Sequence, residues 1–217
     1  MSSLPFRWLG GSAGRYLFVT ALLLFFVVLS VQYSAKAVSG RSAILRWQPQ
    51  IVEMDEGANI AERHNYPNPP VMAVLLMPVM KLPPLAAALV WFYLKVGLAL
   101  ASFGMVFYVV QKNGVFFPPW AMGLTVLLSL RPIMGDLQHA NVNIFILFLV
   151  VASLAAYARG WDWSAGVVLG LAVACKVTPA LFIPYFLWKR EWKVLGGCAV
   201  GLLLFLYPGL LPAAVLG

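Results

Sequence analysis

Two adjacent carboxylates, Asp55 and Glu56, are the first residues of this chain that could perform chemistry. They lie in the stretch MDEGANIAERHNYPNPP (54–70), directly after Glu53. A carboxylate within hydrogen-bonding distance of a hydroxyl group can accept its proton in a transition state, so either acid could act as a general base. The alternative is that these acids only balance nearby basic residues on a solvated loop. Those basic residues are Lys36, Arg41, Arg46 and Arg63.

A second group of polar residues lies between two apolar runs, in RPIMGDLQHANVN (131–143). Its polar members are Arg131, Asp136, Gln138, His139, Asn141 and Asn143. If the chain is helical from Gln138 onward, Gln138 and Asn141 share one face, and His139 and Asn143 share another. Such donors suit a sugar or a phosphate, whereas the alternative is an ordinary polar loop at a membrane boundary. No metal-ligand spacing is present, so we expect neither a metal ion nor another cofactor.

Lys176 is a third candidate, because an ionisable residue inside an apolar segment points to a functional site. The alternative is that its ammonium group extends to the lipid headgroups. For Lys95, in another apolar run, we expect a structural partner or the same extension to the headgroups. Tyr66 begins YPNPP (66–70), a candidate binding element that could also be only a stop before a helix, where proline is common.

The composition indicates what must position these residues. Hydrophobic residues make up 62% of the 217 residues, charged residues 10%, and the mean hydropathy is +0.88. A soluble domain needs more polar surface than this, so we predict an all-α polytopic transmembrane helical bundle. The net charge of +8 comes from basic residues scattered between apolar runs, which argues against nucleic-acid binding. Cys175 and Cys198 lie in apolar runs and are expected to be free, buried thiols.

The apolar runs divide one membrane domain, residues 1–217, into elements. A crossing helix needs about 20 apolar residues. Membrane-spanning helices are expected at about 16–33, 85–110, 117–130, 144–157 and 194–211. Residues 34–84 should form an external first loop that ends in an interfacial or re-entrant segment (69–84). Residues 164–193, interrupted by Lys176 and Pro179, should form a hairpin of two short helices, the broken kind that lines a cavity.

The distribution of basic residues favours a cytoplasmic N-terminus only weakly, because the two sides carry nearly equal numbers. In that orientation the first loop, the 131–143 insert and the bend at Lys176 all face the external side. This convergence is the stronger argument for an external site built from the three groups.

In this order, the segments resemble glycosyltransferase family 87, a family of GT-C membrane enzymes that includes polyprenol-phosphate-mannose-dependent alpha-mannosyltransferases. The resemblance begins with Asp55, which follows the first helix. It continues with YPNPPVMAVLLMPVMKLPP (66–84), similar to the family's YPP-type segment, and QHANVNIFILFL (138–149), similar to its Gln-x-x-Asn element. It ends with GLAVACKVTPALFIPYFLWKREWK (170–193), similar to its Lys-x-x-Pro segment.

The resemblance implies a GT-C-like fold and inverting sugar transfer from a polyprenyl-phosphate donor to a hydroxyl of a glycan, lipid or other acceptor. The reaction would occur on the outer face of a multi-pass protein in the bilayer of a bacterial plasma membrane. Asp55 would be the general base, with Glu56 as its rival. From the chemistry of the side chains we infer that Lys176, Arg131 or His139 stabilises the phosphate leaving group. Gln138 and Asn141 would orient sugar hydroxyls, with Asn143 and Tyr66 as further binding residues.

Members of the family are usually much longer, so a fragment, a split protein or a degenerate relative is expected. Two other classes of function stay open. One is a transporter or lipid-binding membrane protein without catalysis, which the break near Lys176 and Pro179 would suit. The other is a non-catalytic assembly subunit. The transporter or lipid-binding alternative leaves the carboxylates of the first loop unexplained.

Overall fold

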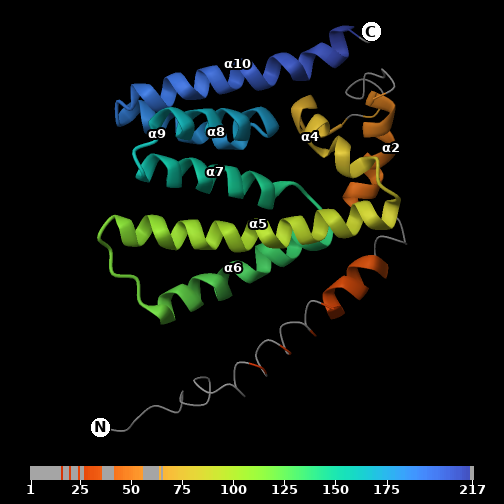
Figure 1. Cartoon of the computed structure of the whole chain (residues 1–217), viewed down its shortest axis with the longest axis horizontal. Helices are drawn as coiled ribbons and strands as arrows, with labels where there is room; N and C mark the ends of the chain where they lie inside the picture. Colours follow the sequence, from red (N-terminus) through yellow and green to blue (C-terminus); the bar gives the residue numbers. More distant parts are fainter. Residues whose placement is uncertain are drawn as a thin grey trace.

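A computed structural model describes residues 16, 20, 24, 27–35, 42–55, 64 and 66–215. All of its regular elements are helices, and the described residues contain no strand, which confirms the all-α prediction. Residues 27–35 are helical. The other elements are α2 (Ala43–Asp55), α4 (Pro70–Met80), α5 (Pro84–Lys112), α6 (Pro119–His139), α7 (Asn143–Ala158), α8 (Asp162–Cys175), the 3-10 helix η2 (Thr178–Leu181), α9 (Phe182–Trp188) and α10 (Trp192–Val215) (Figure 1).

Paired prolines begin three of these helices. Pro69-Pro70 precedes α4, Pro83-Pro84 precedes α5 and Pro118-Pro119 precedes α6, with the second proline always the first helical residue. Proline suits this position because the first N–H of a helix has no intrahelical partner and the fixed φ is already helical. The sequence therefore marks these three helix starts directly.

Helices α5, α6 and α7 alternate in direction. Lys95 of α5 contacts Asp136 near the end of α6, so α6 returns toward the start of α5. Trp91 and Tyr108 of α5 contact Phe145 and Arg159, respectively, so α7 runs parallel to α5. The end of α6 and the start of α7 therefore lie at the same end of the bundle as the start of α5, which we call the polar end (Figure 1).

A glycine seam joins α8 to α10. A Cβ atom on Gly166 would lie 2.1 Å from the Val194 carbonyl oxygen, and one on Gly170 would lie 2.7 Å from the Cys198 carbonyl oxygen. Moving from Gly166 to Gly170 on α8 moves the contact from Val194 to Cys198 on α10, so the two helices are parallel. Small residues four apart allow such close backbone approach, which drives helix association where lipid removes the hydrophobic contribution. Because α8 runs back along α7, its C-terminus also lies at the polar end.

Helix α2 covers the C-terminus of α4. Ile44, Trp47, Ile51 and Met54 are buried, and their helical spacing forms the apolar face of α2. Gln48 donates its amide Nε2 to the carbonyl oxygens of Met80 and Leu82, both at 2.8 Å. These bonds satisfy carbonyl groups that the end of a helix leaves without partners.

The helix expected at about 117–130 is longer than predicted, because α6 continues through Arg131 and Pro132 to His139. Proline is tolerated within a helix when neighbouring groups satisfy the freed carbonyl. Among the described helices, α5, with 29 residues, is long and apolar enough to cross a membrane. The remaining apolar helices cover 70–80, 143–158, 162–175, 178–188 and 192–207 and are shorter. The multi-pass arrangement stays a prediction.

Candidate functional site

The corner between α6 and α7 carries four of the predicted binding residues. Helix α6 ends at His139, Ala140 adopts a left-handed conformation with φ of 56°, and α7 begins at Asn143. The condition for Gln138 and Asn141 to share a helical face is therefore not met, since these two residues lie on opposite sides of a turn. The reversal instead turns the chain back along the bundle while keeping the polar side chains at one end.

Two side chains of α5 hold this corner in place. The indole Nε1 of Trp91 donates to the carbonyl oxygen of Ala140 at 3.1 Å. The ammonium Nζ of Lys95 donates to the main-chain oxygen of Asp136 at 2.7 Å and to its carboxylate Oδ2 at 3.2 Å. Lys95 is fully buried and Asp136 is 7% exposed. The expectation of a structural partner for Lys95 is confirmed, because this ion pair neutralises both buried charges.

A cavity of about 440 Å³ opens beside the corner, between α5, α6 and α7. Its polar lining residues are Ser129, Asp136, His139, Asn141 and Asn143, and its apolar ones include Phe103, Ile133, Ile144 and Leu147. A lining that combines polar and apolar side chains suits an amphiphilic ligand. Its volume lies in the range of roughly 300–1,000 Å³ that is usual for small-molecule sites.

A second cavity, of about 330 Å³, adjoins the first and contains Lys176. Asn143 and Leu147, four residues apart on α7, line both cavities. Lys176 ends α8 in an extended conformation, with φ of −160° and ψ of 134°. Its ammonium Nζ donates to Asn143 Oδ1 at 2.5 Å. The break after α8 thus brings Lys176 to the amide at the boundary between the cavities.

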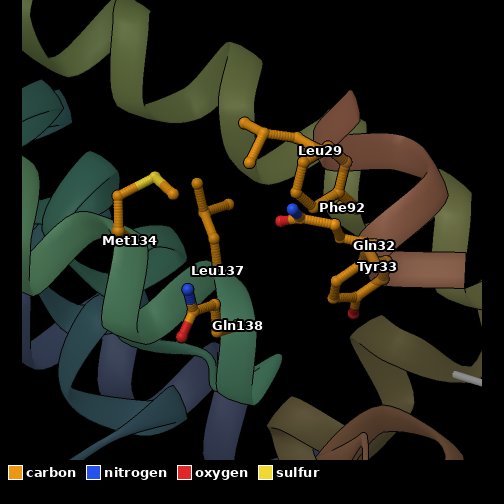
Figure 2. Close-up of a pocket in the computed structure, with 7 residues that line it drawn as sticks. All are labelled: Leu29, Gln32, Tyr33, Phe92, Met134, Leu137 and Gln138. Carbon is orange, nitrogen blue, oxygen red and sulfur yellow. The ribbon is translucent and has the colours of Figure 1, made fainter. Parts of the chain in front are cut away.

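Gln138 lies on another side of α6. It lines a cavity of about 190 Å³ with Met134 and Leu137 of the same helix, whereas Gln32 and Tyr33 come from the helix at 27–35. Figure 2 shows these side chains on facing sides of the cavity, with Phe92 of α5 also labelled. The structure therefore separates Gln138 from His139, Asn141 and Asn143, with which the sequence grouped it.

Tyr66 is buried just before α4. Its ring packs edge-on against Trp47, with 5.9 Å between centroids, and it belongs to the same apolar cluster as Cys175, the neighbour of Lys176. Its hydroxyl has no hydrogen-bond partner among the described residues. Burial raises the pKa of this phenol to about 12, so it stays protonated at any ordinary pH.

The predicted general bases are placed only in part. Asp55 is the last residue of α2, and its side chain is not described, whereas Glu56 lies outside the described residues. The neighbouring Glu53 accepts a hydrogen bond at its Oε2 from His64 Nε2, at 2.7 Å. Glu53 thus takes part in local charge pairing. Arg131 is exposed and lies on α6, one residue from the Pro132 that lines the larger cavity.

Three residues of this region were missed or undervalued by sequence reasoning. The sequence did not single out Trp91, because a tryptophan in an apolar helix usually only packs in the hydrophobic core. Lys95 and Asp136 each stood out as charges, but their pairing across 41 residues is visible only in the fold. Within the described part of the chain, no group of three His, Cys, Asp or Glu residues could hold a metal ion.

Comparison with known proteins identifies the family. A model of glycosyltransferase family 87 matches residues 66–217, more than half of the chain. Similar proteins include the polyprenol-phosphate-mannose-dependent alpha-(1-2)-phosphatidylinositol mannoside mannosyltransferases of Mycolicibacterium smegmatis and Mycobacterium tuberculosis. The first is 37% identical over 71 residues, covering 33% of this chain and 16% of that protein. The second is 34% identical over 64 residues, covering 30% and 14%.

A third relative, the M. smegmatis polyprenol-phosphate-mannose-dependent alpha-(1-2)-phosphatidylinositol pentamannoside mannosyltransferase, is 29% identical over 126 residues, covering 57% of this chain and 29% of that protein. The chain therefore spans less than a third of the length of these curated relatives. No solved structure matches it. The match over 66–217 includes the α6–α7 corner, both adjoining cavities and Lys176, and by this match the chain belongs to glycosyltransferase family 87.

Proposed function

We propose that this protein acts as a membrane glycosyltransferase that moves a mannosyl or similar hexosyl group from a polyprenyl phosphate to a hydroxyl acceptor. The observation that carries the proposal is the Lys176–Asn143 hydrogen bond at the boundary between the two cavities. It puts a cation with no carboxylate partner among the described residues beside a polar cavity and an apolar wall. A lipid phosphate that carries a sugar needs all three features.

In this proposal Lys176 stabilises the phosphate as it leaves. The bond from the anomeric carbon to the phosphate oxygen breaks and leaves its electron pair on that oxygen, where a cation lowers the energy of the developing charge. Asn143 orients the ammonium group, and His139 and Arg131 supply further positive or donor groups at the same end. The apolar lining, including Leu147, Val150 and Phe182, accommodates the first units of the lipid chain.

The acceptor hydroxyl attacks the anomeric carbon from the face opposite the phosphate, which inverts its configuration. A carboxylate accepts the hydroxyl proton as the new bond forms. Asp55 is our candidate for this base, because it ends α2 and α2 packs on α4 at the polar end of the bundle. Glu56 is the rival base. Asn141 binds sugar hydroxyls at the larger cavity, whereas Gln138, which faces the 190 Å³ cavity, and Tyr66 are candidates for contacts with the acceptor.

We place the polar end on the extracytoplasmic side of the membrane, with the bundle crossing the bilayer several times. The opposite end supports this orientation, because basic and aromatic side chains gather there. The Cζ atom of Arg159 lies 4.7 Å from the centroid of the Tyr108 ring, and the Nζ atom of Lys189 lies 5.4 Å from that of Tyr185. Cytoplasmic ends of membrane helices are rich in Lys and Arg, and aromatic residues mark the membrane interface.

The test is transfer of labelled mannose from polyprenyl-phosphate-mannose in membranes that contain the protein. We expect a product with the wild type and a 10²- to 10⁴-fold lower rate with Asp55→Asn. Asp162→Asn, a matched change at the opposite end of the bundle, should keep the wild-type rate. A wild-type rate with Asp55→Asn would refute Asp55 as the base. Transport of a solute without any transfer product would favour the transporter alternative.

A further inference from the structure

The Asp136 carboxylate has one oxygen without a partner. Its Oδ2 accepts a hydrogen bond from Lys95, but its Oδ1 is buried and has no partner among the described residues. Leaving a buried acceptor on a charged group unsatisfied is costly, so such an atom usually marks the place of a ligand or a water molecule. Other atoms of Asp136 line the 440 Å³ cavity, so a rotation of the carboxylate would bring Oδ1 to a ligand held there.

The surroundings of Asp136 define the chemistry of that ligand. Lys95 already neutralises the carboxylate, so the cavity has no excess positive charge for a phosphate at this point. The side chains of Ser129, Asn141 and Asn143 line the same cavity and can each donate and accept hydrogen bonds. A neutral group with several hydroxyls satisfies a free carboxylate oxygen and these amides together.

The position of the cavity indicates which polyol it takes. Asn143 lines both this cavity and the one that contains Lys176, and its Oδ1 accepts the Lys176 hydrogen bond. A phosphate bound at Lys176 therefore has its sugar substituent within reach of Asn143. The sugar of the lipid-linked donor is the group that enters the adjoining cavity and meets Asp136.

We propose that Asp136, held in place by Lys95, is a sugar-binding residue that accepts hydrogen bonds from hydroxyl groups of the donor's hexose. This inference rests on the proposed function and divides the donor between the two cavities. The lipid phosphate binds at Lys176 and the sugar binds beside Asp136, with Asn143 between them. The acceptor's own sugar has the same chemistry, and the experiment separates the two sources.

The experiment compares two ligands, polyprenyl phosphate and polyprenyl-phosphate-mannose, binding to the purified protein in lipid nanodiscs. We expect Asp136→Asn to weaken binding of the mannose-bearing lipid by about tenfold to a hundredfold, because a hydrogen bond to a charged acceptor is lost. Binding of polyprenyl phosphate should stay within about twofold of the wild type. Lys176→Met should weaken both ligands.

Binding of polyprenyl phosphate also reports whether each variant is folded. If Asp136→Asn does not fold, Lys95→Met/Asp136→Leu decides, because it removes the carboxylate without leaving a buried charge unpaired. It should show the same selective loss. Equal weakening of both ligands, or no weakening, in the folded variant would overturn the assignment of Asp136 while leaving the proposed function standing.

Two further outcomes are decisive. If Asp136→Asn raises the KM for the acceptor and leaves donor binding unchanged, the cavity holds the acceptor, and the donor assignment is refuted. If the wild type binds neither lipid, the proposed function fails, and the sugar site fails with it. If the wild type binds both lipids, a negative result with the Asp136 variant therefore counts against the sugar site alone and not against the proposed function.

Discussion

Lys176 donates a hydrogen bond to Asn143 across 33 residues of sequence, joining the break after α8 to the first residue of α7. Two short helices thereby bring a cation that lines the smaller cavity to an amide that lines both cavities. The two residues are far apart in the sequence, so their contact depends on how α7 and α8 pack.

Replacing Lys176 by methionine should reduce use of the lipid-linked donor. The substitution keeps the length of the side chain and removes its charge, so a charge-assisted hydrogen bond to the phosphate, worth roughly 1.5–3 kcal/mol, is lost. We expect kcat/KM to fall by about tenfold to a hundredfold in the membrane transfer assay. Lys193→Met, on α10, is the matched control, and an equal loss there would attribute the effect to general surface charge.

Breaking the Lys95–Asp136 ion pair from one side should destabilise the bundle. Lys95→Met leaves a buried carboxylate without compensation, which costs about 3–5 kcal/mol. The double variant Lys95→Met/Asp136→Leu removes both charges and should recover much of the loss, measured as the midpoint of thermal unfolding in detergent. A double variant as unstable as the single one would show that packing of Lys95, and not its charge, matters.

The glycine seam between α8 and α10 should tolerate no added methyl group. Gly166→Ala puts a Cβ atom 2.1 Å from the Val194 carbonyl oxygen, which requires the helices to move apart. We expect a loss of about 1–3 kcal/mol from this overpacking, visible in the unfolding midpoint. Gly97→Ala is the control, because a Cβ atom there meets nothing within 4 Å. Equal effects at the two positions would argue against a tightly packed seam.

Removing the Tyr66 hydroxyl should separate binding from stability. The hydroxyl has no partner among the described residues, so Tyr66→Phe should leave stability at neutral pH unchanged or slightly raised. If the hydroxyl binds substrate, the KM should rise nonetheless. An unchanged KM with unchanged stability would remove Tyr66 from the site.

The same variant tests the pKa of this phenol. The pKa is about 12 in the folded protein and about 10 in an unfolded chain, so the unfolded state loses its proton first as pH rises. Tyr66 therefore stabilises the fold fully below pH 10, and this contribution falls progressively above it. We expect Tyr66→Phe to lose less stability than the wild type between pH 10 and 12, measured by denaturant unfolding. If the stability of both proteins falls equally with pH over that range, the raised pKa of Tyr66 is refuted.

The sequence by itself indicated most of the apolar helices, several of their ends and the membrane-like composition, but not α2, which lies within the predicted first loop. Paired prolines mark the starts of α4, α5 and α6, because a first helical residue needs neither an N–H partner nor freedom in φ. The residues of the motifs could also be recognised, since Lys176 and the polar group over 131–143 contrast with apolar neighbours.

Only the tertiary structure decided which of these residues meet. Asp136 pairs with Lys95, Asn143 pairs with Lys176, and Gln138 turns to a different cavity. An apolar pattern indicates that a charge is buried but not which distant group neutralises it. The left-handed turn at Ala140 also gave no sequence signal, because alanine rarely adopts that conformation and does so here where α5 holds the corner through Trp91.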